Sequence, residues 1–287
     1  MNFDKKDNFY ASSIASAPEV EVEKLATMDM FAGCGGLTEG MHQAGVVDTR
    51  WAIEFDEDAA EAFRLNHAGA VVYSHNCNSL LLNCVRKAGL QEYLSATIDE
   101  EAINQADKLS AREYEMLPLP GQVDFICGGP PCQGFSGMNR FTKSTWSKVQ
   151  NDMVLGFLSY ADIYRPKYFL LENVRNFVAH NKGQTFRLVV RTLLELGYQV
   201  RFGVLNAGNF GVSQARKRLF IWGAAPGCKL PEWPKPLHTF ACPQISIPLP
   251  NKEKVSKCMH RSSFLTFITH HYYFFPFFLS NSIRHIP

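Results

Sequence analysis

Three short motifs carry side chains that could act together in covalent chemistry. The first contains Cys132, in a Gly-Gly-Pro-Pro-Cys-Gln-Gly-Phe-Ser segment that follows the apolar run 123–127. Prolines fix the backbone, and glycines allow it to approach a flat ligand closely. An isolated cysteine is more often a small buried residue, but this setting is typical of a loop that presents a nucleophilic thiol.

The second and third motifs supply a carboxyl and two guanidinium groups. Glu172 ends the apolar run 168–171, and ligands of open α/β sheets bind at such strand ends. Arg216 and Arg218 precede the apolar run 219–222, and their planar groups can bind phosphate or base oxygens. Taken alone, that basic run would more often be a solvated edge.

A glycine-rich segment near the amino terminus predicts a nucleotide-like ligand. Residues 29–37 read Asp-Met-Phe-Ala-Gly-Cys-Gly-Gly-Leu, between a strand pattern and a helix pattern. Such glycines let the backbone approach a ligand at the helix amino terminus. Glu54 ends the next strand about 20 residues on, where an acid typically binds ribose hydroxyls. A nicotinamide dinucleotide is the alternative ligand, although Gly-x-Gly-x-x-Gly is not satisfied.

The elements that must position these motifs alternate along the chain. Such alternation predicts an α/β fold with a parallel sheet covered on both faces. Strand patterns cover 26–31, 51–54, 70–73, 123–127 and 168–172, and two final strands at 198–205 and 219–223 are expected to pair antiparallel. Helix patterns cover 37–44, 57–66, 153–164 and 184–196, most of them ended by Gly or Pro.

The chain divides into three predicted regions. Residues 1–24 form a flexible lead-in, 25–250 form the core, and 251–287 form an aromatic-rich tail without helix or strand period, expected to be disordered. Within the core, the acidic segment 91–116 is interpreted as a solvated helical insertion. The tail lacks the uninterrupted apolar run of about 20 residues that a membrane span needs.

Composition narrows the function only slightly. The 287 residues carry a net charge of +2, which favours neither a nucleic-acid partner nor its absence. Eight cysteines without a Cys-x-x-Cys pair predict neither a disulfide framework nor a metal site. No signal peptide and no dense Lys/Arg cluster is found, so the residues do not by themselves indicate a subcellular location.

The motifs, in this order and spacing, resemble those of the DNA cytosine-5 methyltransferases. Their amino-acid sequences are most similar to those of the maintenance-type branch of plants and algae. The resemblance implies a Rossmann-like class I fold with a mostly parallel seven-stranded sheet and helices on both faces. It also implies S-adenosylmethionine as cofactor. The implied cofactor-binding residues are Phe31, Ala32, Gly33, Cys34, Gly35, Gly36, Leu37, Glu54, Phe55, Asn76, Cys77 and Pro130.

The resemblance also implies the reaction. Cys132 would attack carbon 6 of a cytosine flipped out of double-stranded DNA, while Glu172 contacts ring nitrogen 3. Arg216 and Arg218 would contact the cytosine carbonyl oxygen and a backbone phosphate, in an order that the sequence leaves open. The implied process is methylation of CpG sites in the nucleus, without a metal.

Two alternatives remain open at this point. After Val255 we find no counterpart of the family's target-recognition region or of its last motifs, so the chain could be a catalytically silent fragment that binds cofactor or a partner. A branch of the family that methylates transfer RNA is the other alternative. The residues after Cys132 match the DNA branch more closely.

Overall fold

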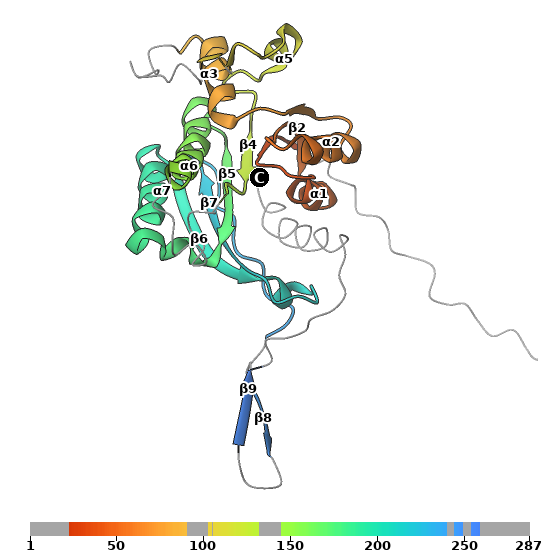
Figure 1. Ribbon diagram of the computed structural model, residues 1–287, viewed down its shortest axis with the longest axis vertical. Coiled ribbons are helices and arrows are strands. Elements are labelled where there is room, and N and C mark those ends of the chain that lie inside the picture. The colour runs from red at the N-terminus through yellow and green to blue at the C-terminus, as the bar shows by residue number, and fades with distance from the viewer. Residues whose placement is uncertain are drawn as a thin grey trace, which may run out of the picture.

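The computed structural model describes residues 23–90, 103–104, 106–131, 145–239, 244–248 and 254–258. Its centre is a seven-stranded sheet with the strand order β3-β2-β1-β4-β5-β7-β6 (Figure 1). The strands are β1 (Leu25–Met30), β2 (Val47–Ile53), β3 (Val71–Tyr73), β4 (Phe125–Gly128), β5 (Tyr168–Val174), β6 (Gln199–Asn206) and β7 (Lys217–Ala224). The pairs among β1 to β5 are parallel, and β7 is antiparallel to both β5 and β6. The mostly parallel sheet and its antiparallel final pair are therefore confirmed.

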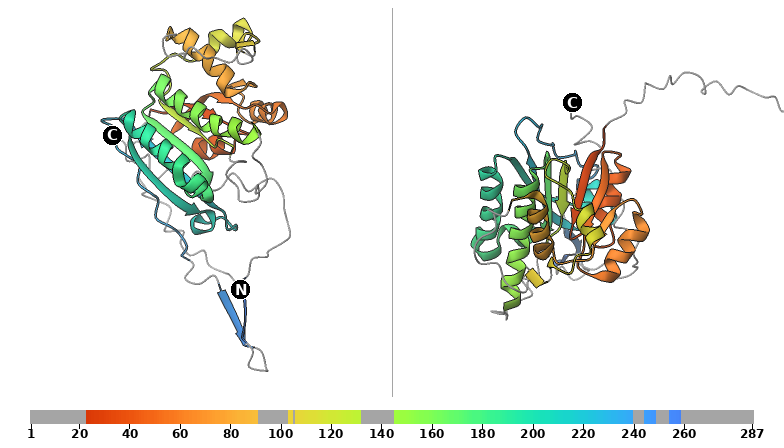
Figure 2. Two further views of the ribbon diagram at one scale, coloured as in Figure 1. Left: turned by 60° about the vertical axis from the view of Figure 1, so that its left-hand side comes forward. Right: turned by 90° about the horizontal axis from the view of Figure 1, so that it is seen from above.

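Helices cover both faces of this sheet, as predicted (Figure 2). The α-helices are α1 (Gly36–Gln43), α2 (Glu57–Asn66), α3 (Cys77–Ala88), α5 (Ala111–Met116), α6 (Thr145–Tyr164) and α7 (Gln184–Glu195). Three short 3₁₀ helices follow strands or precede α7: η2 (Arg175–Val178), η3 (His180–Gly183) and η4 (Ala207–Phe210).

The two faces have separate hydrophobic cores, which explains why the central strands are apolar throughout. In β5, Phe169 and Leu171 pack in the core shared with α3, α6 and α7. Tyr168 and Leu170 point to the opposite face and pack in the core shared with α1. Because successive side chains of a strand alternate between faces, a strand covered on both sides needs apolar residues at every position.

Helix α3 was not predicted. Asn76 is its amino-terminal cap, with the side-chain oxygen accepting from Asn78 N at 2.9 Å, and Gly89 ends it in the left-handed conformation. The sequence around Asn76 predicts only a ligand-binding motif, and no helix or strand is predicted for the residues that follow it. The apolar face of α3 packs in the core through Leu80 and Cys84.

The interpretation of 91–116 as a solvated helical insertion agrees with α5, which has no buried residue, but not with Ala106. Ala106 is buried, and its carbonyl accepts from Asn83 Nδ2 at 2.8 Å. Trp51 Nε1 donates to the carbonyl of Met116 at 3.1 Å, so α5 lies against the sheet edge beside α3 (Figure 1). The capping box of Ser110 and Glu113 starts α5 locally, whereas the hydrogen bonds that attach this segment to the fold come from the distant residues Trp51 and Asn83.

Residues near the carboxyl end of the described chain form a separate two-stranded antiparallel sheet. Its strands are β8 (Gln244–Pro248) and β9 (Lys254–Cys258), and β9 lies within the predicted tail. The rest of the tail and nearly all of the predicted lead-in lie outside the described residues. No helix in the described ranges is long and apolar enough to cross a membrane.

Candidate active site

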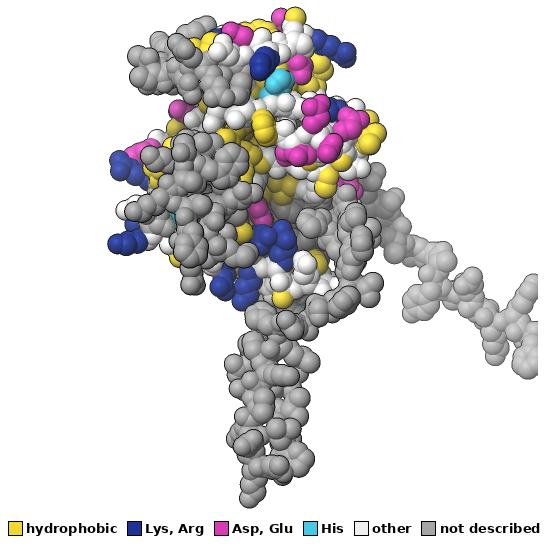
Figure 3. Space-filling view, in the orientation of Figure 1, with side chains coloured by type: hydrophobic (Ala, Val, Ile, Leu, Met, Phe, Trp, Pro, Cys, Tyr) yellow, Lys and Arg dark blue, Asp and Glu magenta, His cyan; other side chains and the backbone are white. Residues whose placement is uncertain are grey.

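The strand ends that the sequence analysis singled out surround one cavity of about 410 Å³. It lies at the carboxyl ends of β1, β4 and β5 and is closed on one side by residues from η4 to β7. Ligands of open parallel sheets bind at this edge. Figure 3 shows Lys and Arg side chains gathered beside the hollow, so a cationic surface adjoins the cavity.

The loop between β1 and α1 forms one wall of the cavity. The predicted cofactor residues that line it are Phe31, Ala32, Gly33, Cys34, Gly36 and Leu37. Phe31, Gly33 and Gly35 have φ angles of 57°, 54° and 92°, so the loop turns sharply before α1 begins. Left-handed backbone is tolerated by glycine at little cost but strains Phe31. The strained residue lies at the cavity wall, with its ring edge-on to Phe157.

Glu54 holds this loop in place. Its Oε2 accepts from Gly33 N at 2.8 Å and its Oε1 from Asp56 N at 2.9 Å. The carboxylate thus holds the glycine loop from the end of β2, a structural role that the spacing did not indicate, and its contact with ribose hydroxyls stays a prediction. The next residue, Phe55, is 73% exposed and does not line the cavity.

Asn76 and Cys77 are more involved in the fold than we expected. The Asn76 oxygen caps α3, and Cys77 is buried with its carbonyl accepting from Tyr160 Oη at 2.8 Å. Burial raises the pKa of the Cys77 thiol to about 12. Neither residue lines the cavity. Because the Asn76 oxygen already accepts the capping hydrogen bond of α3, only its second lone pair is left for a ligand.

Glu172 and Arg218 form an ion pair at the cavity. Arg218 Nε lies 2.9 Å from Glu172 Oε1, and each side chain is about one-quarter exposed. Arg218 is paired in register with Val174, two residues beyond Glu172, so the two side chains are diagonal neighbours on one face. Burial raises the pKa of Glu172 above its ordinary value, and the positive charges of Arg218 and Arg216 oppose this rise.

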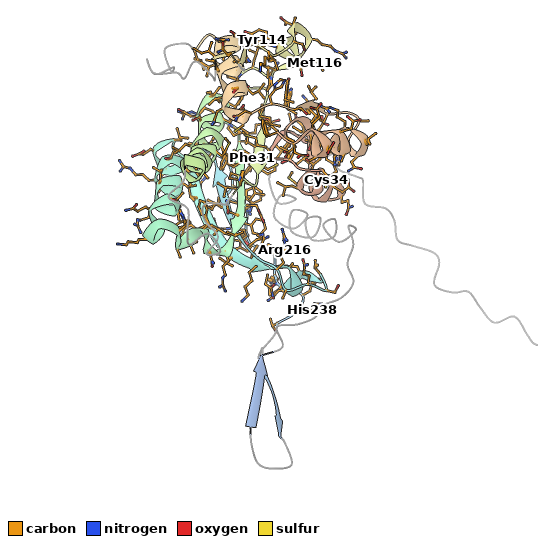
Figure 4. The ribbon with its side chains drawn as sticks, in the orientation of Figure 1. Phe31, Cys34, Tyr114, Met116, Arg216 and His238 are labelled. Atoms are coloured by element: carbon orange, nitrogen blue, oxygen red, sulfur yellow. The ribbon has the colours of Figure 1, made fainter. Side chains whose placement is uncertain are left out.

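Arg216 lies at the cavity from the segment just before β7. Phe31, Cys34 and Arg216 all line the cavity, and Figure 4 shows Arg216 below the other two. Burial lowers the pKa of Arg216, the charge of Arg218 lowers it further, and Glu172 raises it. The guanidinium groups of Arg216 and Arg218 therefore both interact electrostatically with the carboxyl of Glu172.

The segment that leads to Cys132 begins next to Glu172. A Cβ placed on Gly129 would lie only 3.1 Å from Glu172 Oε2, so any larger residue here would press on the Glu172 carboxyl. Asn173 Nδ2 donates to the carbonyl of Pro130 at 3.2 Å and fixes the start of the loop. Cys132 itself lies outside the described residues. The predicted thiol follows Gly129 by three residues and Pro130 by two.

Comparison with known proteins decides the family of this chain. The model of the C-5 cytosine-specific DNA methylase family matches residues 25–81 and 82–267. The chain belongs to this family. DNA (cytosine-5)-methyltransferase 1B of Oryza sativa is 60% identical over 79% of the chain, and DNA (cytosine-5)-methyltransferase 1 of Rattus norvegicus is 48% identical over 85%.

The chain spans only about 15% of the length of these curated relatives. Among solved structures, the Dnmt2 methyltransferase of S. pombe is 20% identical, with a TM-score of 0.46 over 71% of this chain and 50% of the other. The membership of the C-5 cytosine-specific DNA methylase family thus rests on sequence.

This member of the C-5 cytosine-specific DNA methylase family has one site residue that our sequence reasoning missed. Asp29, at the end of β1, lines the cavity and is 1% exposed. Its Oδ2 accepts from Thr38 Oγ1 at 2.7 Å, and its Oδ1 has no hydrogen-bond partner in the described structure. Burial raises the pKa of Asp29 to about 7, against the weaker effects of Thr38 and Cys127. The sequence signal that could have identified Asp29 is an acidic residue near the end of a mostly apolar strand.

The cavity combines a glycine loop, a carboxyl beside two guanidinium groups and a buried acid. Among the described residues, no group of three or more His, Cys, Asp or Glu side chains could hold a metal ion.

Proposed function

We propose that this chain transfers a methyl group from S-adenosylmethionine to carbon 5 of cytosine in DNA. The observation that carries the proposal is the Glu172–Arg218 pair, 2.9 Å apart, at the point where the loop leading to Cys132 begins. Family membership and the shared cavity with the glycine loop support the same reaction.

The residues around the cavity fit the methyl donor. The unpartnered Oδ1 of Asp29 can accept a hydrogen bond from an ammonium group, and the amino terminus of α1 favours a carboxylate. Glu54, Phe55 and Asn76 do not line the cavity, and their roles toward the ribose hydroxyls, the adenine ring and its edge rest on the resemblance alone. When bound, S-adenosylmethionine supplies an electrophilic methyl group.

Cys132 and Glu172 activate the base. The cytosine ring is a poor nucleophile at carbon 5, so the Cys132 thiolate adds to carbon 6 and makes carbon 5 electron-rich. Glu172 stabilises or protonates ring nitrogen 3 during this attack, and its raised pKa favours the protonated form that can donate. After methylation, carbon 5 loses its proton, the bond to Cys132 breaks, and the thiolate is regenerated.

The arrangement of the two arginines supports an assignment that the sequence left open. In cytosine the carbonyl oxygen is bonded to the carbon next to nitrogen 3, so the guanidinium that already contacts Glu172 is the better placed for that oxygen. We assign this contact to Arg218. Arg216, which also lines the cavity, would bind a backbone phosphate of the flipped nucleotide.

The proposed partner is double-stranded DNA, from which the target cytosine has to leave the stack for its carbon 5 to enter the cavity. A nuclear location, CpG sites and a maintenance role follow from the resemblance to the plant branch. Comparing hemimethylated, unmethylated and transfer-RNA substrates in a methyl-incorporation assay would test these finer assignments.

The first experiment traps the reaction. The purified chain is incubated with S-adenosylmethionine and duplex DNA carrying 5-fluorocytosine, since fluorine at carbon 5 blocks the final elimination. A covalent adduct that the Cys132→Ala variant does not form would support the proposal. A folded chain that forms no adduct would favour the alternative of a catalytically silent fragment.

A further inference from the structure

The carboxyl end of α2 contacts the cofactor loop through two consecutive side chains. Asn66 Nδ2 donates to the carbonyl of Cys34 at 3.0 Å, and His67 Nε2 lies 3.3 Å from the carbonyl of Gly35. Glu54 already binds Gly33 N from the end of β2. Three successive residues of the loop are therefore held from the unit formed by β2 and α2.

These contacts fix the direction of backbone donors. A peptide group is planar and trans, so its N–H points opposite to its carbonyl. The Gly35 carbonyl accepts from Glu39 N of α1 at 2.8 Å and also lies 3.3 Å from His67 Nε2, so two partners hold its peptide group. The N–H of Gly36, in the same peptide group, therefore points away from both. Gly36 is the first residue of α1, where an N–H has no partner within the helix, and it lines the cavity. The His67 contact thus adds to the helix hydrogen bond in keeping a helix-end donor available for a ligand.

The contact of Asn66 has a related effect one residue earlier. The carbonyl of Cys34 belongs to the same peptide group as the N–H of Gly35, and this N–H donates to the carbonyl of Ala32 at 3.0 Å. Asn66 therefore stabilises the turn from Ala32 to Gly35 from its outer side. Both side chains act on the loop without lining the cavity themselves.

His67 is packed tightly in this position. It is 7% exposed, and its ring centroid lies 4.7 Å from that of Phe63 and 5.4 Å from that of His42. A Cβ on Gly35 would approach His67 Nε2 to 2.4 Å, so the ring fits only against a glycine. Burial lowers the pKa of His67, which favours a neutral ring that donates through Nε2.

We propose that Asn66 and His67 are positioning residues that set the backbone of the glycine loop for S-adenosylmethionine. The inference rests on the proposed function, because it concerns the same ligand. It adds that the affinity for this ligand depends on two side chains that do not line the cavity.

The test uses the 287-residue chain and S-adenosylhomocysteine, titrated by calorimetry. Asn66→Ala removes one donor, and His67→Phe keeps an aromatic ring while removing the other. Each variant should bind about threefold to tenfold more weakly, the usual effect of one lost hydrogen bond. His67→Gln, which carries an amide donor, should recover part of the affinity. Leu65→Ala, at a side chain 77% exposed on the same helix, is the control and should bind normally.

A second measurement separates positioning from general stability. Thermal unfolding without ligand should change little between His67→Phe and His67→Gln, while their affinities differ. Equal affinity in all variants would overturn the inference, as would an affinity loss that follows the unfolding temperature and is not rescued by glutamine. If the unsubstituted chain does not bind S-adenosylhomocysteine, the cofactor assignment itself is wrong.

Discussion

Replacing Asp29 by asparagine should change how the stability of this protein depends on pH. The carboxyl is 1% exposed, and only one of its oxygens has a hydrogen-bond partner among the described residues. Burial raises its pKa to about 7, against an ordinary value of 3.8. Between these two values the folded state keeps a proton that the unfolded state has released.

The sign and size follow from this difference. Because the folded state binds the extra proton, the free energy of unfolding falls as pH rises from 3.8 toward 7 and is level above 7. The slope for one proton is about 1.4 kcal/mol per pH unit, so the whole range corresponds to about 4 kcal/mol. Asp29→Asn has nearly the same shape but does not titrate, so this contribution should be absent from the variant.

Urea unfolding between pH 5 and 9 provides the assay, with tryptophan fluorescence as the signal because Trp222 is fully buried. The unfolding free energy of the unsubstituted chain minus that of Asp29→Asn should fall by about 2 kcal/mol from pH 5 to 7 and then level off. The exposed Asp58→Asn variant controls for the loss of one charge and should keep the unsubstituted profile. A difference that is constant, or that increases with pH, would refute the reasoning.

Three further predictions concern the catalytic carboxyl, the glycine loop and a buried histidine. Glu172→Gln should form the 5-fluorocytosine adduct about 100-fold more slowly or worse, because the general acid is lost, and an unchanged rate in rapid-quench assays would contradict the role. Gly35→Ala should lower the unfolding free energy more than Gly33→Ala. At Gly35 φ is 92° and the new Cβ would lie 2.4 Å from His67, whereas at Gly33 a Cβ meets nothing within 4 Å and only about 1 kcal/mol of backbone strain is expected. Equal losses for the two variants in urea titration would show that the contact with His67 is harmless. Because the pKa of His67 is lowered in the folded state, the unfolded state takes up the imidazole proton first as pH falls through 6.5. His67→Phe should therefore lose less stability than the unsubstituted chain between pH 7 and 5 in thermal unfolding. Parallel stability curves for the two chains would argue against this assignment.

Local patterns in the sequence were sufficient for most of the fold. Apolar runs such as 168–172 predicted strands buried on both faces, and here β5 extends two residues further, to Val174; Gly197 correctly marked the end of α7. Helix α3 was missed because its motif at Asn76 was interpreted only as ligand chemistry. The polar surface of the segment around α5 is visible in the sequence, whereas its hydrogen bond with Trp51 is not.

The sequence by itself determined which residue types stand at the strand ends: a glycine loop after β1, a carboxyl at the end of β5 and two arginines beside β7. Local order along the chain is enough for this, because side-chain periodicity and turn residues act over a few positions. Only the tertiary structure decided the partners. Arg218 meets Glu172 because β7 runs antiparallel beside β5 in one register, and a shift of one residue would send the arginine to the other face. Asn66 reaches a carbonyl 32 residues away because α2 folds back over the glycine loop, and Asp29 retains a proton near neutral pH because the sheet around it excludes water.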